Sequence, residues 1–199
     1  MTLGLTGGYC AGKSSVAAIL QKDGWKILSV DAFGHEALRL SLPAVLELLG
    51  PQAVKADGSP DRRFIGSRVF ADPALLERYE AIVHPVMNEL TARAVGEGGS
   101  KVCIDAALLY RLPIVEACDA VLEVRTPIIT RLWRAYRRDG IGPGAALDRI
   151  ARQSHLWKSA FQYQGITAVI WNSGSKASLE KKIHGALSQI YNKNKTSLA

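Results

Sequence analysis

The residues with the clearest potential for chemistry lie near the start of the chain, in the run Gly7-Gly8-Tyr9-Cys10-Ala11-Gly12-Lys13-Ser14. This run satisfies the pattern G-x-x-x-x-G-K-[ST], in which successive backbone N–H groups curl around phosphate oxygens. A short apolar run at positions 2–6 precedes it, and a helix-compatible stretch at positions 14–21 follows it. The pattern therefore lies between a strand and a helix, as phosphate binding requires, and a ligand-free glycine turn is the weaker interpretation.

The side chains of this loop indicate the chemistry of its ligand. Lys13 can reach the β- and γ-phosphates of a nucleoside triphosphate, and the Ser14 hydroxyl can ligate Mg²⁺. The start of the following helix adds positive potential at the same place. Cys10 carries a Cβ where glycine would be favoured, so either its backbone is ordinary or some strain is tolerated. A thiol there could be weakly sensitive to oxidation, although a merely small residue is the simpler interpretation.

Two aspartates follow predicted strands. Asp31 comes directly after the apolar run 27–30, and Asp105 directly after the run 102–104. Ligands of open parallel sheets gather at the carboxyl ends of the strands, so the Asp31 carboxylate could accept or orient the proton of an attacking hydroxyl. The alternative is an N-cap for a helix that begins near residue 32, and spacing alone leaves the two interpretations even. Asp105 could support a bound Mg²⁺ ion, but a cap or an ion pair is equally compatible with its position.

Arginines crowd the segment after the fourth apolar run, which predicts one helix that carries Arg125, Arg131, Arg134, Arg137 and Arg138. Arg134 and Arg138 are four positions apart and share a face, where guanidinium groups can grip phosphate oxygens. The glycine-rich stretch 139–144 that follows predicts a hinge. We therefore predict a lid over about residues 134–148, with a solvated basic face as the alternative.

Five short apolar runs must form the frame that positions these residues, at 2–6, 27–30, 102–104, 120–124 and 168–171. Runs of this length separated by helical patterns predict parallel strands joined by crossover helices, and so an α/β fold. The roughly 70 residues between the second and third runs exceed an ordinary crossover. Apolar residues from Pro73 to Leu90 recur at threes and fours, which predicts a long helix with Asp72 as its N-cap.

Composition bounds the class of protein. A chain of 199 residues with 48% hydrophobic residues supports one domain, and it contains no apolar run that could span a membrane. Three cysteines without metal-like spacing exclude a disulfide framework and a zinc site, and they favour the reducing cytoplasm. The net charge of +7 favours an anionic partner: nucleic acid, membrane headgroups or phosphorylated small molecules. The tryptophans Trp133, Trp157 and Trp171 could pack near the lid or an adenine, with core packing as the default interpretation.

The order of the motifs resembles that of the dephospho-CoA kinase family over most of the chain. The matching segments are the phosphate loop, Asp31 with Gly34-His35-Glu36, His84-Pro85, Leu108-Leu109-Tyr110, Arg138-Asp139-Gly140, Arg149-Ile150 with Gln153, and Asn172-Ser173-Gly174. The resemblance implies a single P-loop kinase domain over residues 1–199, similar to nucleoside monophosphate kinases. Its parts would be a five-stranded parallel core, a helical substrate lobe at about residues 55–98 and the lid.

The same resemblance implies ATP-dependent phosphorylation of the 3′-hydroxyl of dephospho-CoA in the cytoplasm, giving coenzyme A and ADP. The implied catalytic residues are Lys13, Asp31 as the base, and Arg138, with Ser14 as the ligand of Mg²⁺. The implied ATP-binding residues are Gly8, Cys10, Ala11, Gly12, Lys13, Ser14, Ser15, Arg134, Arg138 and Asn172. The implied substrate-binding residues are Asp31, Arg63, His84, Leu108 and Leu109. The partners would then be ATP and dephospho-CoA, with no nucleic acid and no membrane.

The chain departs from the family pattern at three places. Ser29 replaces the first acid of a common Asp-Ala-Asp, Arg111 replaces an acid after the Leu-Leu-aromatic segment, and Cys10 replaces a glycine. Two alternatives therefore stay open. One is another small P-loop kinase of a nucleotide or metabolite alcohol. The other is a nucleotide-gated nucleic-acid-binding protein, which salt-sensitive binding to DNA or RNA would indicate.

Overall fold

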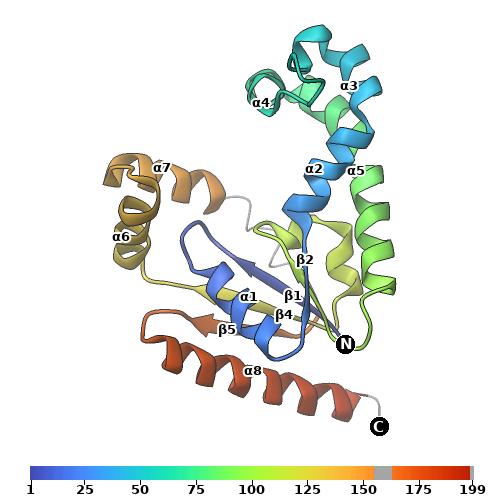
Figure 1. The fold of residues 1–199 in the computed structure, drawn as a ribbon. Coiled ribbons are helices and arrows are strands. Elements are labelled where there is room, and N and C mark those ends of the chain that lie inside the picture. The colour runs from blue at the N-terminus through green and yellow to red at the C-terminus, as the bar shows by residue number, and fades with distance from the viewer. Residues whose placement is uncertain (155–162, 198–199) are drawn as a thin grey trace. The chain divides into compact units, whose positions relative to one another are not determined.

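The computed structural model describes residues 1–154 and 163–197 (Figure 1). The chain divides into two compact units. We call Met1–Leu28 with Gly98–Ala199 the core unit, and Ser29–Glu97 the helical unit. Each is described by itself. Within the described residues, no helix is long and apolar enough to cross a membrane.

The core unit is built on a five-stranded sheet, which confirms the predicted α/β frame. The strands are β1 (Thr2–Gly7), β2 (Lys26–Ser29), β3 (Val102–Asp105), β4 (Ala120–Arg125) and β5 (Thr167–Trp171), in the spatial order β2-β3-β1-β4-β5. The pairings of β1 with β3, β1 with β4 and β4 with β5 are parallel. Leu5 of β1 lies opposite Asp105 of β3 and Leu122 of β4. The central strands β1, β3 and β4 are buried almost throughout, and this is why they read as unbroken apolar runs.

Among its described residues, the core unit also contains four helices: α1 (Lys13–Lys22), α6 (Ile128–Asp139), α7 (Pro143–Ser154) and α8 (Lys176–Ser197). The helices α1 and α8 pack together on the sheet, where α8 also contacts β5 (Figure 1). Two 3₁₀ turns, Leu109–Arg111 and Pro113–Ala117, connect β3 to β4. The main cluster of buried side chains includes Leu5, Leu20, Leu122 and Ile183.

The placement of Arg125 in the arginine-rich helix was wrong. Arg125 is the last residue of β4, and α6 begins only at Ile128 after Pro127 in the N-cap position. A proline has no backbone N–H to donate and favours the start of a helix over its interior. The other four arginines lie on α6, which ends at Gly140 with φ +66.

The helical unit contains α2 (Val30–Leu40), α3 (Leu42–Leu49), a 3₁₀ turn (Pro51–Ala53), α4 (Arg62–Val69) and α5 (Pro73–Gly96). The predicted long helix and its cap are confirmed, since the Asp72 side chain accepts hydrogen bonds from Ala74 N at 2.9 Å and Leu75 N at 3.3 Å. The helices α2, α3 and α4 all contact α5. The buried face of α5 includes Val83 and Met87, so the periodic apolar residues of this helix serve packing.

Candidate active site

The phosphate loop follows β1 and depends on two residues in the left-handed backbone region. Gly12 has φ +91, and a Cβ at this position would collide with the side-chain amide of Asn172. Only glycine therefore fits there. Cys10 has φ +58, so of the two possibilities considered for its backbone, the strained one is correct. The Cys10 side chain is 8% exposed and packs with Ala135 and Ala146, which helps to hold the strained turn.

Donor side chains hold the carbonyl groups of this loop on one side. Arg131 Nε donates to the Tyr9 carbonyl at 2.7 Å, and Arg134 donates to the Ala11 carbonyl at 3.1 Å. Asn172 Nδ2 and Thr126 Oγ1 donate to the same Ala11 oxygen at 3.0 and 2.8 Å. In a trans peptide the C=O and N–H groups point in opposite directions. The backbone N–H of Gly12 is therefore directed away from these donors, to the side where a phosphate can bind.

Lys13 and Ser14 open α1 at the end of this loop. The ammonium group of Lys13 forms an ion pair with the Asp105 carboxylate, which stands at the end of the neighbouring strand β3. This confirms the ion-pair interpretation of Asp105. The two side chains are 18% and 16% exposed, so the pair lies at the rim of the core, where a phosphate group could compete for Lys13. Ser14 and Ser15 are exposed on the first turn of α1.

A cavity of about 800 Å³ lies beside the loop, between α1, α6 and the segment after β5. Its lining includes Cys10, Gly12, Ser14, Ser15, Trp133, Arg134, Arg137, Arg138, Asn172 and Gly174. Most of the predicted ATP-binding residues are therefore brought together on one cavity. The expectation of core packing was wrong for Trp133, which is 61% exposed with Arg137 at 5.5 Å from its ring centroid. It was also wrong for the exposed Trp171, and Trp157 lies outside the described residues.

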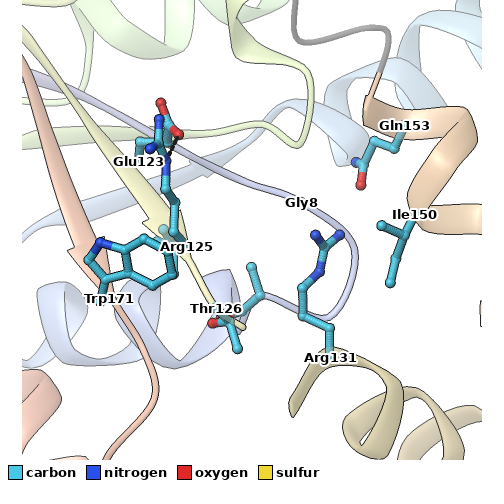
Figure 2. Close-up of a pocket in the computed structure, with 10 residues that line it drawn as sticks. Gly8, Glu123, Arg125, Thr126, Arg131, Ile150, Gln153 and Trp171 are labelled. Carbon is cyan, nitrogen blue, oxygen red and sulfur yellow. Dashed lines mark hydrogen bonds and ion pairs between the residues drawn. The ribbon is translucent and has the colours of Figure 1, made fainter. Parts of the chain in front are cut away.

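A second cavity, of about 330 Å³, is lined by Gly8 of the loop and by residues of β4 and α7. Figure 2 shows Arg131 pointing toward this glycine, with Ile150 and Gln153 of α7 nearby and the pair Glu123–Arg125 at the opposite end. The Arg125 guanidinium donates to the buried Glu123 carboxylate at 2.5 Å, and the Tyr110 hydroxyl donates to it at 3.3 Å. Burial raises the pKa of Tyr110 to about 12. The Glu123 carboxylate thus already has two hydrogen-bond partners.

Arg138 lies near the end of α6 and is exposed. Its guanidinium donates to both carboxylate oxygens of Asp139, at 2.8 and 2.9 Å. These bonds lower the pKa of Asp139, and the same contact raises the pKa of Arg138. Arg134, by contrast, points inward and binds the carbonyl groups of the loop. Although Arg134 and Arg138 share a face of α6, Arg134 therefore binds the loop and Arg138 binds Asp139.

Asp31 lies in the first turn of α2, in the helical unit, and its side chain is exposed. The interpretation of Asp31 as an N-cap was wrong, because Ser29 is the N-cap and its Oγ accepts from Ala32 N at 3.4 Å. Arg63 on α4 and His84 on α5 are also exposed residues of the helical unit. All three residues therefore belong to the helical unit, whereas the phosphate loop belongs to the core unit.

Leu108 and Leu109 follow β3 in the core unit. Leu109 is fully buried and packs over Gly4 of β1, where an added Cβ would meet its side chain. Leu109 thus supports the sheet next to the loop. Leu108 is half-buried at the start of the 3₁₀ turn. Of these two predicted substrate contacts, only Leu108 exposes side-chain surface.

Comparison with known proteins identifies the family. The family model described as "CoaE: Dephospho-CoA kinase" matches residues 1–193. The chain belongs to the dephospho-CoA kinase family. It is 35% identical over 195 residues to the dephospho-CoA kinase of Anaeromyxobacter dehalogenans, covering 94% of this chain and 91% of that protein. It is 37% identical over 194 residues to that of Deinococcus radiodurans, with the same two coverages.

Solved structures share the fold of this chain. The crystal structure of TT1252 from Thermus thermophilus is similar with a TM-score of 0.80 and 28% identity, covering 95% of this chain and 97% of that one. The dephospho-CoA kinase from Campylobacter jejuni has a TM-score of 0.61 at 20% identity, covering 95% and 96%. A shikimate kinase from Acinetobacter baumannii has a TM-score of 0.54 at 19% identity, covering 94% and 93%, and shares the fold alone.

Four residues in or next to the loop of this dephospho-CoA kinase family member carried no individual role in the sequence interpretation. They are Tyr9, Thr126, Arg131 and Gln153, whose side-chain Oε1 accepts from the Tyr9 N–H at 2.5 Å. Thr126 directly follows β4, and its place at a strand end was the signal that could have indicated it. Arg131 and Gln153 were visible only as members of larger motifs. Tyr9 occupies a position of the loop pattern at which any residue is allowed.

Proposed function

We propose that this chain transfers the γ-phosphoryl group of ATP to the 3′-hydroxyl of dephospho-CoA, giving coenzyme A and ADP. The observation that carries the proposal is a complete phosphate loop within a chain that matches the family over residues 1–193. Its three unpaired cysteines fit the cytoplasm, where this reaction would take place.

The core unit would hold ATP. The triphosphate would lie on the loop, where the ordered N–H groups and Lys13 face it, and Lys13 would leave Asp105 for the β- and γ-phosphates. The cavity beside Trp133 and Asn172 has room for the nucleoside. Arg134 would support this arrangement through the loop carbonyls that it binds.

The donor atoms at the loop suit Mg²⁺. This ion binds few protein oxygens and completes its shell with water and substrate phosphates. The exposed Ser14 hydroxyl at the start of α1 is such a ligand, and it would hold the ion. When bound, Mg²⁺ would neutralise phosphate charge. Within the described residues no cluster of His, Cys, Asp or Glu offers a competing all-protein site.

The helical unit would supply the acceptor side of the reaction. The Asp31 carboxylate is exposed and does not cap the helix, so it can accept or orient the proton of the 3′-hydroxyl. Arg63 and His84 would contact the anionic and polar parts of dephospho-CoA within a substrate lobe at about residues 55–98. Arg138, on a lid of about residues 134–148, would exchange Asp139 for the transferred phosphoryl group and stabilise its charge.

An ADP-release assay with dephospho-CoA, adenosine, AMP and shikimate as separate acceptors tests the proposal. Among these four acceptors, we expect turnover only with dephospho-CoA. We expect the turnover rate of Lys13→Ala to be lower by about 100-fold or more. Lys22→Ala is the matched control, because Lys22 is an exposed lysine in the last turn of the same helix. Turnover with another acceptor in place of dephospho-CoA would indicate a different small kinase. Salt-sensitive binding to DNA without turnover would indicate a nucleic-acid-binding protein.

A further inference from the structure

The Tyr9 side chain extends from the phosphate loop to the helices α6 and α7. The Arg138 guanidinium lies 5.3 Å from the centroid of its ring, and the Arg149 guanidinium lies 5.6 Å from it. The Tyr9 hydroxyl donates to the Asp139 carboxylate and accepts from Arg149 at 3.3 Å. One side chain of the loop thus contacts both an arginine of α6 and an arginine of α7.

The phosphate-loop pattern does not require this ring. Position 9 is one of the four unrestricted positions of the pattern, and the turn itself depends on Gly12 and on the donors to the carbonyl groups. The ring therefore adds something to the loop that phosphate binding by the backbone does not need. What it adds is contact with two cations.

Both arginines need such a contact if they are to act together on one ligand. Their side chains are 59% and 54% exposed, so without a partner each would sample many rotamers. A cation over an aromatic ring is held through the ring face. The N–H donors of a guanidinium radiate in its own plane and stay available for phosphate oxygens. The Tyr9 ring can therefore orient Arg138 and Arg149 through its faces, and the Tyr9 hydroxyl occupies one donor of Arg149, at 3.3 Å, leaving the others for phosphate.

Asp139, unlike the Tyr9 ring, occupies hydrogen-bond donors of Arg138. Its carboxylate occupies two donors of Arg138, at 2.8 and 2.9 Å, and lies 3.9 Å from Arg149. A triphosphate carries more negative charge than one carboxylate and can replace it as the acceptor. Exchange of Asp139 for phosphate would leave the ring contacts intact.

We propose that Tyr9 is a positioning residue that holds Arg138 and Arg149 against the phosphate loop and orients them toward the transferred phosphoryl group. This inference rests on the proposed function for its reaction, and on the structure alone for the coupling between Tyr9 and the two arginines. It assigns Tyr9 no contact with the reacting atoms.

Steady-state kinetics of Tyr9→Ala and Tyr9→Phe test the ring contact. We expect kcat of Tyr9→Ala to fall about tenfold, because a misplaced charged group loses transition-state stabilisation. Tyr9→Phe keeps the ring and should stay within about threefold of the parent. Tyr136→Ala, which removes an exposed tyrosine of α6, is the control and should leave kcat unchanged. A parental kcat in Tyr9→Ala would overturn the proposal.

A double-mutant cycle separates positioning from a structural role. If Tyr9 acts through Arg138 and Arg149, then Tyr9→Ala should change kcat by less than about twofold in an Arg138→Ala, Arg149→Ala background. An undiminished tenfold loss in that background would contradict positioning and indicate damage to the loop.

The same cycle on the affinity for a non-hydrolysable ATP analogue needs no acceptor. We expect Tyr9→Ala to weaken this affinity about threefold or more in the parent, and by less than about twofold in the double-arginine background. The coupling can therefore be measured even if dephospho-CoA is not the acceptor, so that failure of the proposed function and failure of this inference give different results. Equal losses of affinity in both backgrounds would count against the inference.

Discussion

Because Ser29 caps helix α2, the Asp31 carboxylate is available for other interactions. Because the Ser29 hydroxyl accepts the Ala32 N–H at the start of α2, the Asp31 carboxylate is left exposed in the first helical turn. A negative charge is stabilised at this end of a helix by the helix dipole. The replacement of an acid by Ser29 in the family pattern therefore leaves the second acid both present and available.

Asp31→Asn should lower kcat by about 100-fold or more while the affinity for ATP stays near that of the parent, because the amide cannot take up a proton. Turnover assays and calorimetric titration of ATP measure the two quantities. Glu36→Gln is the matched control, since Glu36 lies on the same helix and pairs only with Arg39 at the surface. A kcat near the parental value in Asp31→Asn would remove Asp31 from the mechanism.

The three cysteines should differ in reactivity. Burial raises the pKa of the Cys118 thiol to about 12 and raises the pKa of Cys103 further, so both stay protonated at pH 8. The thiolate is the reactive form, so both thiols should react slowly at pH 8.

We expect Ellman's reagent at pH 8 to label at most Cys10 in the folded protein and all three thiols after denaturation. Labelling at Cys118 should rise only as the pH approaches its raised pKa. Cys10→Ala should abolish the labelling of the folded chain, and ATP should slow it in the parent. Fast labelling of the Cys10→Ala protein would contradict the raised pKa of the Cys103 and Cys118 thiols.

At the scale of elements, the Ala11 carbonyl of the loop is held by three separate parts of the chain: the residue after β4, helix α6 and the segment after β5. The pattern of glycines and lysine predicted the loop, and the apolar runs predicted the strands on either side. The supports were harder to predict, because Thr126 and Asn172 meet Ala11 only through the sheet order β1-β4-β5. A residue whose role is to bind a distant carbonyl leaves no local pattern.

Gly12→Ala should lower the free energy of unfolding by about 1–3 kcal/mol, because alanine at φ +91 is strained and its Cβ meets Asn172. We expect ATP binding to be lost as well, since the backbone must shift. Urea unfolding and nucleotide titration measure both effects. Gly24→Ala is the control for the backbone cost alone: it has φ +84 and no atom within 4 Å of the added Cβ. An equal loss of nucleotide affinity in Gly24→Ala would contradict the steric explanation.

Asp105→Asn should destabilise the protein without nucleotide by about 1–2 kcal/mol, because Lys13 then keeps a half-buried charge without its partner. The increase in Tm on adding ATP should become larger than in the parent, since phosphate no longer competes with a carboxylate for Lys13. Differential scanning fluorimetry with and without ATP measures both. A smaller ATP-induced increase would show that Asp105 assists nucleotide binding instead.

At the scale of the whole molecule, the net charge of +7 is partly explained by α6, where four arginines face the loop and its cavity. Composition favoured an anionic partner but could not distinguish nucleic acid from a nucleotide. In the structure, Arg131 and Arg134 donate to loop carbonyls instead of extending over an open surface. The exposure of Trp133 could not be predicted from its residue type, because large apolar residues are usually placed in the core.

The two units should respond to the two substrates separately. In hydrogen exchange, a non-hydrolysable ATP analogue should protect residues 7–15 and 128–139 of the core unit. Dephospho-CoA should protect segments within residues 29–97. Protection of residues 29–97 by the nucleotide alone, with none from dephospho-CoA, would argue against a substrate lobe in the helical unit.

The central place of β1 in the sheet has a consequence for how the protein is made. Strand β1 pairs with residues 102–105 and 120–124, which are synthesised after it, and the loop behind it is completed by Asn172, which is 161 positions from Ala11 in the chain. Contacts of such long range form slowly and late in folding. A nascent chain that ends before Asn172 therefore carries the whole phosphate-loop motif but not the side chain that holds its Ala11 carbonyl. During synthesis, ATP can favour folding only once the segment that carries Asn172 has emerged.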